Sequence, residues 1–211
     1  MTTGHFRQEF ILPDQGRPVH NHVGILDVSG SMISSDYLPS RLEAAYAGWL
    51  AYLAQIIRRH PASLIATICF SEAACVLCPW TRVDALGDLD MVHADWLETS
   101  RAFGLHNTGI GEALQEALPL ISQQRGTTQV VLLTDGHQNV GTDPLGVAPQ
   151  LKSLATVAIV GIGGSPSDVD EELLRQIAST DRYGRPRYRW IGDRDALVAH
   201  YEQLAGGLAR D

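Results

Sequence analysis

The alternation of short apolar runs with longer segments of helical periodicity most constrains the fold of this chain. β-branched runs bounded by breaker residues predict strands at 22–27, 63–70, 74–78, 129–134, 156–162 and 188–191. Apolar residues spaced three and four apart predict helices at 42–57, 110–121, 145–154, 169–178 and 196–208. Strands that alternate with helices favour a mostly parallel sheet that is covered by helices on both faces.

One pair of predicted strands breaks this alternation. The gap between 63–70 and 74–78 is too short for a crossover, so these segments should form a hairpin whose second strand is an antiparallel edge. We therefore predict a doubly wound, three-layer α/β sandwich with a mostly parallel central sheet. We interpret residues 83–103 as a loop with one helical segment around 92–99, residues 1–20 as an N-terminal arm, and residues 21–211 as one domain.

Composition narrows the functional classes. The 211 residues are 45% hydrophobic and 19% charged, which is typical of a globular domain. A net charge of −8 argues against a nucleic-acid-binding surface. Apolar runs stay well short of the roughly 18 residues of a membrane span, and the first residues lack a signal-peptide core. We therefore expect a cytoplasmic protein without membrane insertion, and its three cysteines do not suggest a disulfide framework.

The segment Asp27-Val-Ser-Gly-Ser31 carries the clearest chemical signal. It follows the first core strand, and ligands of open α/β sheets bind beyond the carboxyl ends of the strands. Gly30 permits a tight turn that can place the hydroxyls of Ser29 and Ser31 on the same side. One carboxylate and two hydroxyls are hard oxygen ligands, which suit Mg²⁺ or Mn²⁺ better than zinc.

Two more residues are predicted at the same edge of the sheet. Thr108 is expected to be the N-cap of the helix over 110–121, and Asp135 ends the strand over 129–134 and precedes Gly136. Three loops would therefore bring Asp27, Ser29, Ser31, Thr108 and Asp135 together as a metal site. We expect both carboxylates to lie at an exposed loop edge.

These motifs resemble the von Willebrand factor type A domain with a complete metal-ion-dependent adhesion site. The matches are Asp27-Val-Ser-Gly-Ser31, Thr108 within His-Asn-Thr-Gly-Ile-Gly-Glu-Ala-Leu, and Asp135 within Leu-Leu-Thr-Asp-Gly. The resemblance covers about residues 22–208. It implies that Ser29 and Ser31 bind Mg²⁺ or Mn²⁺ directly, that Thr108 does so directly or through water, and that Asp27 and Asp135 act through water or hold the hydroxyls.

In this family a partner protein completes the metal coordination with an Asp or Glu. The resemblance therefore implies a protein–protein interaction module that is not an enzyme, serving as an adaptor in an intracellular multi-protein system. Single-domain relatives often work beside MoxR-type AAA+ ATPases or with kinase–phosphatase modules. Two alternatives stay open, namely a metal-dependent hydrolase or phosphatase and a metal-free structural scaffold. Against the first, Ser29 stands where phosphatases of similar topology favour a second Asp, and its surroundings lack a G-x-S-x-G elbow.

Other motifs carry weaker hypotheses. Cys75-x-x-Cys78 suggests zinc, but positions three apart on a strand face opposite sides of the sheet. Gly161-Ile-Gly163-Gly164 imitates part of a dinucleotide fingerprint and is better interpreted as a turn. His106 and His137 are candidates for the rim of the metal site. An arginine-rich run before the last helix is a candidate docking surface for an acidic partner; its members are Arg182, Arg185, Arg187 and Arg189.

Overall fold

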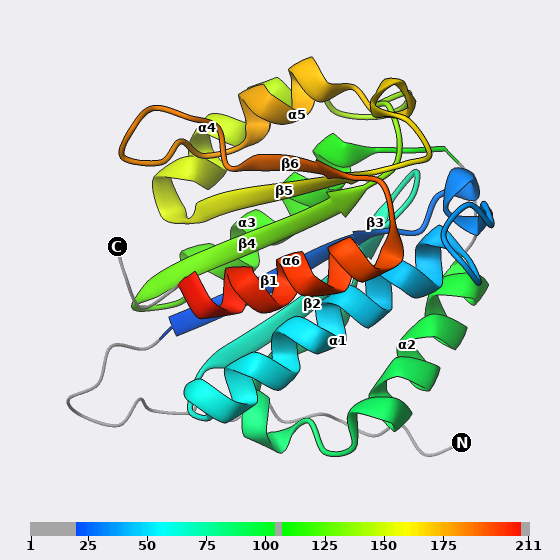
Figure 1. Ribbon diagram of the computed structural model, residues 1–211. Coiled ribbons are helices and arrows are strands. Elements are labelled where there is room, and N and C mark those ends of the chain that lie inside the picture. The colour runs from blue at the N-terminus through cyan, green and yellow to red at the C-terminus, as the bar shows by residue number, and fades with distance from the viewer. Residues whose placement is uncertain (1–19, 104–106, 208–211) are drawn as a thin grey trace, which may run out of the picture.

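A six-stranded sheet forms the centre of the molecule (Figure 1). The computed structural model describes residues 20–103 and 107–207. The strands are β1 (His20–Asp27), β2 (Leu64–Phe70), β3 (Ala74–Arg82), β4 (Thr127–Thr134), β5 (Thr156–Ile162) and β6 (Tyr188–Ile191). Their order is β3-β2-β1-β4-β5-β6, and every pairing is parallel except that of β2 with β3. The predicted fold class, with its antiparallel edge strand, is confirmed.

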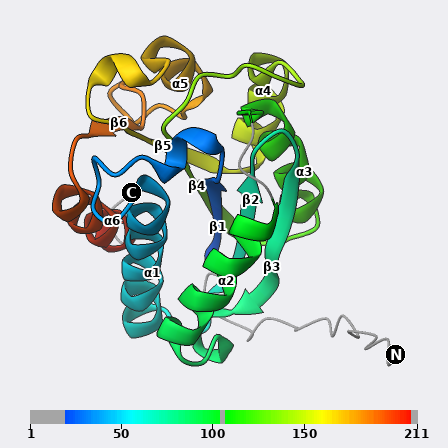
Figure 2. The ribbon, with the colours of Figure 1, turned by 90° about the vertical axis from the view of Figure 1, so that its right-hand side faces the viewer.

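Helices cover both faces of the sheet (Figures 1 and 2). One face packs against α1 (Arg41–Arg59), α2 (Leu89–Phe103) and α6 (Arg194–Gly207). The other face packs against α3 (Ile110–Ser122), α4 (Pro144–Leu154) and α5 (Glu171–Ile177). Single turns of 3₁₀ helix complete the chain at η1 (Gly30–Ile33), η2 (Val83–Ala85) and η3 (Pro166–Asp168). Each face thus has its own hydrophobic core, and the loops at the strand ends lie between them.

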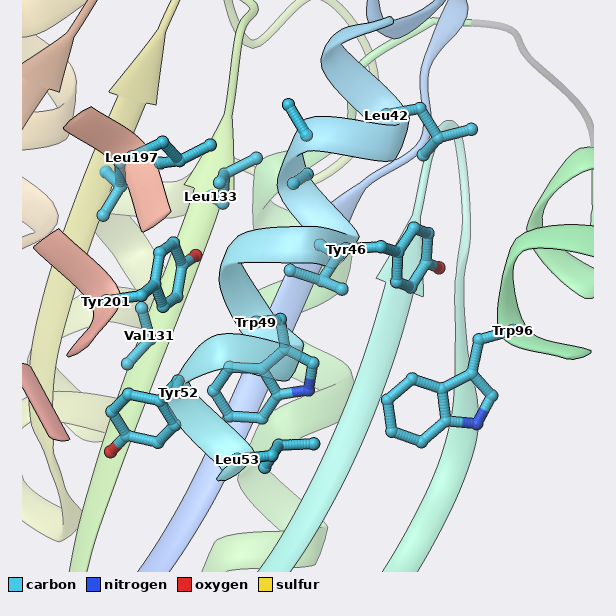
Figure 3. Packing of buried hydrophobic residues seen from close by; sticks show 14 of the residues in the cluster. Leu42, Tyr46, Trp49, Tyr52, Leu53, Trp96, Val131, Leu133, Leu197 and Tyr201 are labelled. Carbon is cyan, nitrogen blue, oxygen red and sulfur yellow. The ribbon is translucent and has the colours of Figure 1, made fainter. Parts of the chain in front are cut away.

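Aromatic side chains of α1 anchor that helix on β1 (Figure 3). The ring of Trp49 is fully buried, stacks on Tyr52 at 5.0 Å between centroids, and donates from Nε1 to Thr67 Oγ1 at 3.1 Å. Gly24 of β1 makes this contact possible, because a Cβ there would lie 2.5 Å from the indole. The helix begins after Ser40, whose side chain accepts from the backbone N–H of Glu43 at 3.2 Å. Helix α1 is thereby fixed along β1, with its first turn near the carboxyl end of that strand.

The region over 83–103 differs from the sequence prediction. The edge strand continues to Arg82, which pairs with Leu64 beyond two register shifts, and α2 spans Leu89–Phe103 rather than 92–99. The inner face of α2 carries Trp96 and the buried polar Ser100, whose hydroxyl hydrogen-bonds that of Tyr46 on α1. A polar residue on the buried face interrupts the apolar stripe, which explains why periodicity ended the predicted helix at 99.

Two further predictions concern the N-terminal arm and membrane insertion. His20, placed in the predicted arm, is the first residue of β1, and the rest of that arm lies outside the described residues. Over 20–103 and 107–207, no helix combines the length and apolar character that a membrane crossing requires.

Candidate functional site

Three loops meet at the carboxyl edge of the sheet, around η1 in Figure 2. The first follows Asp27, the last residue of β1, and carries Ser29 and Ser31; the second precedes α3 and carries Thr108; the third follows β4 and begins with Asp135. Strands β1 and β4 are neighbours in parallel register, with Leu26 opposite Leu133. The chain therefore brings the two aspartates to adjacent strand ends although they are far apart in sequence.

A continuous set of hydrogen bonds joins four of the five predicted residues. The backbone N–H of Ser29 donates to Asp27 Oδ1 at 2.8 Å, and the hydroxyl oxygens of Ser29 and Ser31 are 3.2 Å apart. The Ser31 hydroxyl donates to Asp135 Oδ1 at 2.7 Å. The second oxygen of Asp27 accepts from Thr134 Oγ1 at 2.5 Å, so strand β4 also fixes this carboxylate. We call Asp27, Ser29, Ser31 and Asp135 the polar cluster.

Thr108 lies beside the polar cluster, but the prediction that it is the N-cap of α3 was wrong. The N-cap of α3 is Gly109, not Thr108, and it makes no side-chain capping bond. The Gln138 side chain, from the loop after β4, accepts instead from the backbone N–H groups of Ile110 at 2.5 Å and Gly111 at 3.3 Å. A side chain distant in sequence has replaced the local cap, which leaves the Thr108 hydroxyl uncommitted to the helix.

The position of Thr108 is set from both sides. Its backbone N–H donates to Asn139 Oδ1 at 2.9 Å, and its carbonyl accepts from the Asn139 N–H at 3.0 Å. A Cβ on Gly136 would lie 2.9 Å from Thr108 Oγ1, so this hydroxyl packs against the residue that follows Asp135. Within the described ranges, the hydroxyl forms no hydrogen bond with the polar cluster.

Both carboxylates are buried, and the expectation that they lie exposed was wrong. Asp27 is 0% and Asp135 is 2% exposed. Burial raises the pKa of Asp27 to about 7, and the nearby charge of Asp135 adds to this rise against the hydrogen bonds from Thr134 and Ser29. Burial also raises the pKa of Asp135. A cation placed beside these groups would favour their ionised forms.

Arg41 is a site residue that the sequence prediction missed. Its Nη1 donates to Asp135 Oδ2 at 2.8 Å, while Nε and Nη2 bind Asp36 at 2.9 and 2.6 Å. Nη2 also lies 3.3 Å from Asp168 Oδ2 in η3. The guanidinium lowers the pKa of Asp36 to about 2, and those partners raise the pKa of Arg41 itself. One sequence feature could have revealed Arg41: it is a cation in the first turn of a helix, where the helix dipole disfavours positive charge.

The donor set of this edge suits a hard divalent cation. Its five predicted side chains present hydroxyl and carboxylate oxygens. The 3.2 Å between Ser29 Oγ and Ser31 Oγ is close to the separation of about 3 Å between adjacent ligands of an octahedral Mg²⁺ with 2.0–2.1 Å bonds. In the part of the chain that the structure covers, His, Cys, Asp and Glu side chains do not gather in threes as a metal cluster. Serine and threonine hydroxyls are therefore essential to any metal site here.

The other candidate motifs lie apart from one another. His137 is exposed beside Asp135, and His106 is outside the described residues. Cys75 lies opposite Cys69 and Cys78 opposite Thr67, and both cysteines pack against the same core, so the expectation that they face opposite sides of the sheet was wrong. Over the described residues, they do not join other His, Cys, Asp or Glu side chains in a metal cluster. A Cβ on Gly163 would lie 2.8 Å from the Asp168 side chain, which agrees with a tight turn. In the arginine-rich run, Arg185 pairs with Asp181 at 2.8 Å.

Comparison of the sequence with protein families identifies the family of this chain. The model of the von Willebrand factor type A domain matches residues 23–138, which include Asp27, Ser29, Ser31, Thr108 and Asp135. A search of curated proteins finds no match.

Solved structures with the same fold are numerous. A von Willebrand factor type A protein from Catenulispora acidiphila has a TM-score of 0.70 and 21% identity; the matched region covers 89% of this chain and 42% of that protein. The conserved hypothetical protein BatB from Bacteroides thetaiotaomicron has a TM-score of 0.65 and 21% identity, covering 90% and 99%. Proximal thread matrix protein 1 from the mussel byssus, with a zinc-occupied MIDAS motif, has a TM-score of 0.68 and 20% identity, covering 91% and 48%. This chain thus spans less than half of the first and third proteins, and these identities support a shared fold alone.

Proposed function

This chain belongs to the von Willebrand factor type A domain family, and from that premise we propose that it is a metal-dependent protein-interaction module. The proposed site is a metal-ion-dependent adhesion site built from Asp27, Ser29, Ser31, Thr108 and Asp135. Its ligand is an Asp or Glu side chain of a partner protein, for which this chain acts as an adaptor. When bound, Mg²⁺ or Mn²⁺ supplies an open coordination position to that carboxylate.

The hydrogen-bonded polar cluster is the observation that carries this proposal. Ser29 Oγ and Ser31 Oγ lie 3.2 Å apart, and both carboxylates hold the loop that presents them. Ser29, Ser31 and Thr108 are the proposed direct ligands, with neutral oxygens. Asp27 and Asp135 are the proposed outer acceptors, because their oxygens already bind the Ser29 N–H, Thr134, Ser31 and Arg41.

The charges around the site explain why its ligand should be an anion. The polar cluster contributes two carboxylates, and Arg41 forms a buried ion pair with one of them, Asp135, at 2.8 Å. The proposed direct ligands Ser29, Ser31 and Thr108 are neutral, so no formal negative charge of this chain sits on the metal itself, and an external carboxylate is favoured over a neutral ligand. The chain carries a net charge of −8, so the attraction of an acidic partner must be local to the metal.

The same hydrogen bonds argue against an enzymatic role. A hydrolase needs a general base within reach of a bound water or a nucleophile. Asp27 and Asp135 are committed to hydroxyl, backbone and guanidinium donors, and Ser29 makes its side-chain contact with Ser31. We therefore propose a binding function rather than catalysis.

The direct test is metal binding by the purified chain with the metal alone. Mn²⁺ titration followed by electron paramagnetic resonance should show one site, and Ser31→Ala should weaken it at least about tenfold. Ser35→Ala is the matched control, because Ser35 is exposed on the same loop and lies outside the proposed ligand set. Equal affinities in the two variants would refute the site.

A second measurement addresses the carboxylate. Mn²⁺ held by the protein should broaden the methyl proton resonance of added acetate, and Ser31→Ala or chelator should remove the effect. Metal binding without acetate broadening would leave a metal site and overturn its role in carboxylate recognition.

A further inference from the structure

Two thiols face each other across the hairpin of β2 and β3. Cys69 and Cys75 are directly opposite in the antiparallel register, and their Sγ atoms are 3.3 Å apart. Both are free thiols; Cys69 is buried, and Cys75 is partly exposed near the edge of the sheet. This pair lies outside the polar cluster and has no part in the proposed metal site.

The backbone geometry of this pair suits a covalent link. Directly opposite residues of an antiparallel pair have Cα atoms about 4.5 or 5.5 Å apart. Disulfides span Cα separations of about 4.4 to 6.8 Å, so the strands need not move apart or together to accommodate one. Cys78 has a different environment, because it lies opposite Thr67 and its Sγ is 3.6 Å from Thr81 Oγ1.

We propose that Cys69 and Cys75 form an oxidation site that closes to an intramolecular disulfide in the presence of a peroxide. The Cys75 thiolate, the more accessible of the two, attacks a peroxide oxygen and becomes a sulfenic acid as the O–O bond breaks and, with hydrogen peroxide, hydroxide leaves. The Cys69 sulfur then attacks the Cys75 sulfur, and the S–O bond breaks with release of water. Two thiols lose two electrons and two protons in all, and hydrogen peroxide becomes two waters.

The link would fasten the turn between β2 and β3, which supports the Thr108 loop. The carbonyl of Ser71 accepts from the Gly109 N–H at 2.7 Å, and Glu72 Oε1 accepts from Asn107 Nδ2 at 2.7 Å. These contacts connect the oxidation site to the segment that presents Thr108. The oxidation itself requires no metal, so it stands or falls independently of the proposed function.

The test uses the full chain, folded and metal-free, treated with hydrogen peroxide. Intact mass should fall by two hydrogen atoms, free thiols should fall from three to one, and dithiothreitol should reverse both changes. Peptide mapping should find the Cys69–Cys75 link. Cys78→Ser should retain the link and Cys75→Ser should abolish it, with circular dichroism confirming that both variants are folded.

Three results would overturn the proposal. The first is a mapped disulfide that includes Cys78, and the second is oxidation that stops at Cys75 as a sulfinic acid without a link. The third is retention of all three thiols after peroxide treatment under conditions that oxidise the urea-unfolded chain. Because Cys75 is partly exposed, its serine variant keeps the test valid even where substitution of the buried Cys69 prevents folding.

Discussion

The two ends of strand β1 bury titratable groups in contrasting ways. Near the amino end, His22 lies against Tyr52, whose hydroxyl is 2.8 Å from Nδ1, while Nε2 has no hydrogen-bond partner among the described residues. At the carboxyl end, both oxygens of Asp27 accept hydrogen bonds. Burial shifts both groups toward their neutral forms, but His22 lies in an aromatic core, whereas the two oxygens of Asp27 accept hydrogen bonds that favour its ionised form. Burial alone therefore does not distinguish a structural group from a binding group, whereas its partners do.

Trp49→Ala should produce the largest loss of stability and separate the aromatic core from the site. The indole is fully buried between Tyr52 and Tyr201, so its removal should lower the free energy of unfolding by about 3–5 kcal/mol. Urea unfolding measures this loss, and the exposed Met91→Ala variant is the control. Mn²⁺ affinity of the folded fraction should not change; a parallel loss of affinity would show that the two ends are coupled.

Arg41→Met, at the carboxyl end of β1, should cause the next largest loss of stability. It leaves the buried Asp135 without its cationic partner, which should cost about 3 kcal/mol of stability in chelator. Added Mn²⁺ should restore part of this stability, because a bound cation again compensates the carboxylate. Thermal unfolding with and without Mn²⁺ measures both, and a metal response no larger than that of the wild type would contradict the argument.

Asp27→Asn should weaken metal binding with little loss of fold. An outer partner of a metal site is typically worth about 10- to 100-fold in affinity, and Mn²⁺ titration should show a drop in that range. In chelator the variant should be at least as stable as the wild type, because a fully buried carboxyl is replaced by a neutral amide. If the variant loses cooperative unfolding instead, Asp27 is a structural residue like His22.

The pH dependence of stability should show opposite slopes at the two ends. Burial, with smaller effects of His20 and His60, lowers the pKa of His22 from 6.5 to about 3, so the unfolded chain binds the proton first and stability falls as pH falls below 6.5. The pKa of Asp27 is raised from 3.8 to about 7, so the folded, metal-free chain binds the proton first and stability falls as pH rises through this range.

Variants should expose these two slopes separately between about pH 4 and 6.5. In chelator and relative to the wild type, Asp27→Asn should lose more stability on acidification, by up to about 1.4 kcal/mol per pH unit, and His22→Gln should lose less. Burial lowers the pKa of His200 to about 4, and this residue contributes equally to all three proteins, so the comparison is with the wild-type slope. Urea unfolding across this range is the measurement, and shifts of the same sign in both variants would contradict the contrast.

The sequence predicted the features that depend on local residue patterns, namely the strands and the edge of the sheet that carries the candidate site. β-branched runs located all six strands, and the strand-end positions of Asp27 and Asp135 led to the correct edge of the sheet. The sequence did not predict features that depend on distant partners. Arg41 gains its role from Asp135, and Gln138 replaces a local cap of α3. The burial of the two carboxylates is likewise a product of packing between strands, which no local pattern encodes.

The pairing of β1 with β4 also has a consequence for the order in which the molecule folds. Thr134 binds Asp27 across 107 residues of sequence, whereas the β2–β3 hairpin closes through a short turn. Closing a long loop costs more chain entropy, so we expect the hairpin to form early and the β1–β4 alignment late. Because Asp27 and Asp135 meet only across that alignment, a collapsed chain without it has no assembled cluster. Ligand binding at this edge would therefore report that folding is complete.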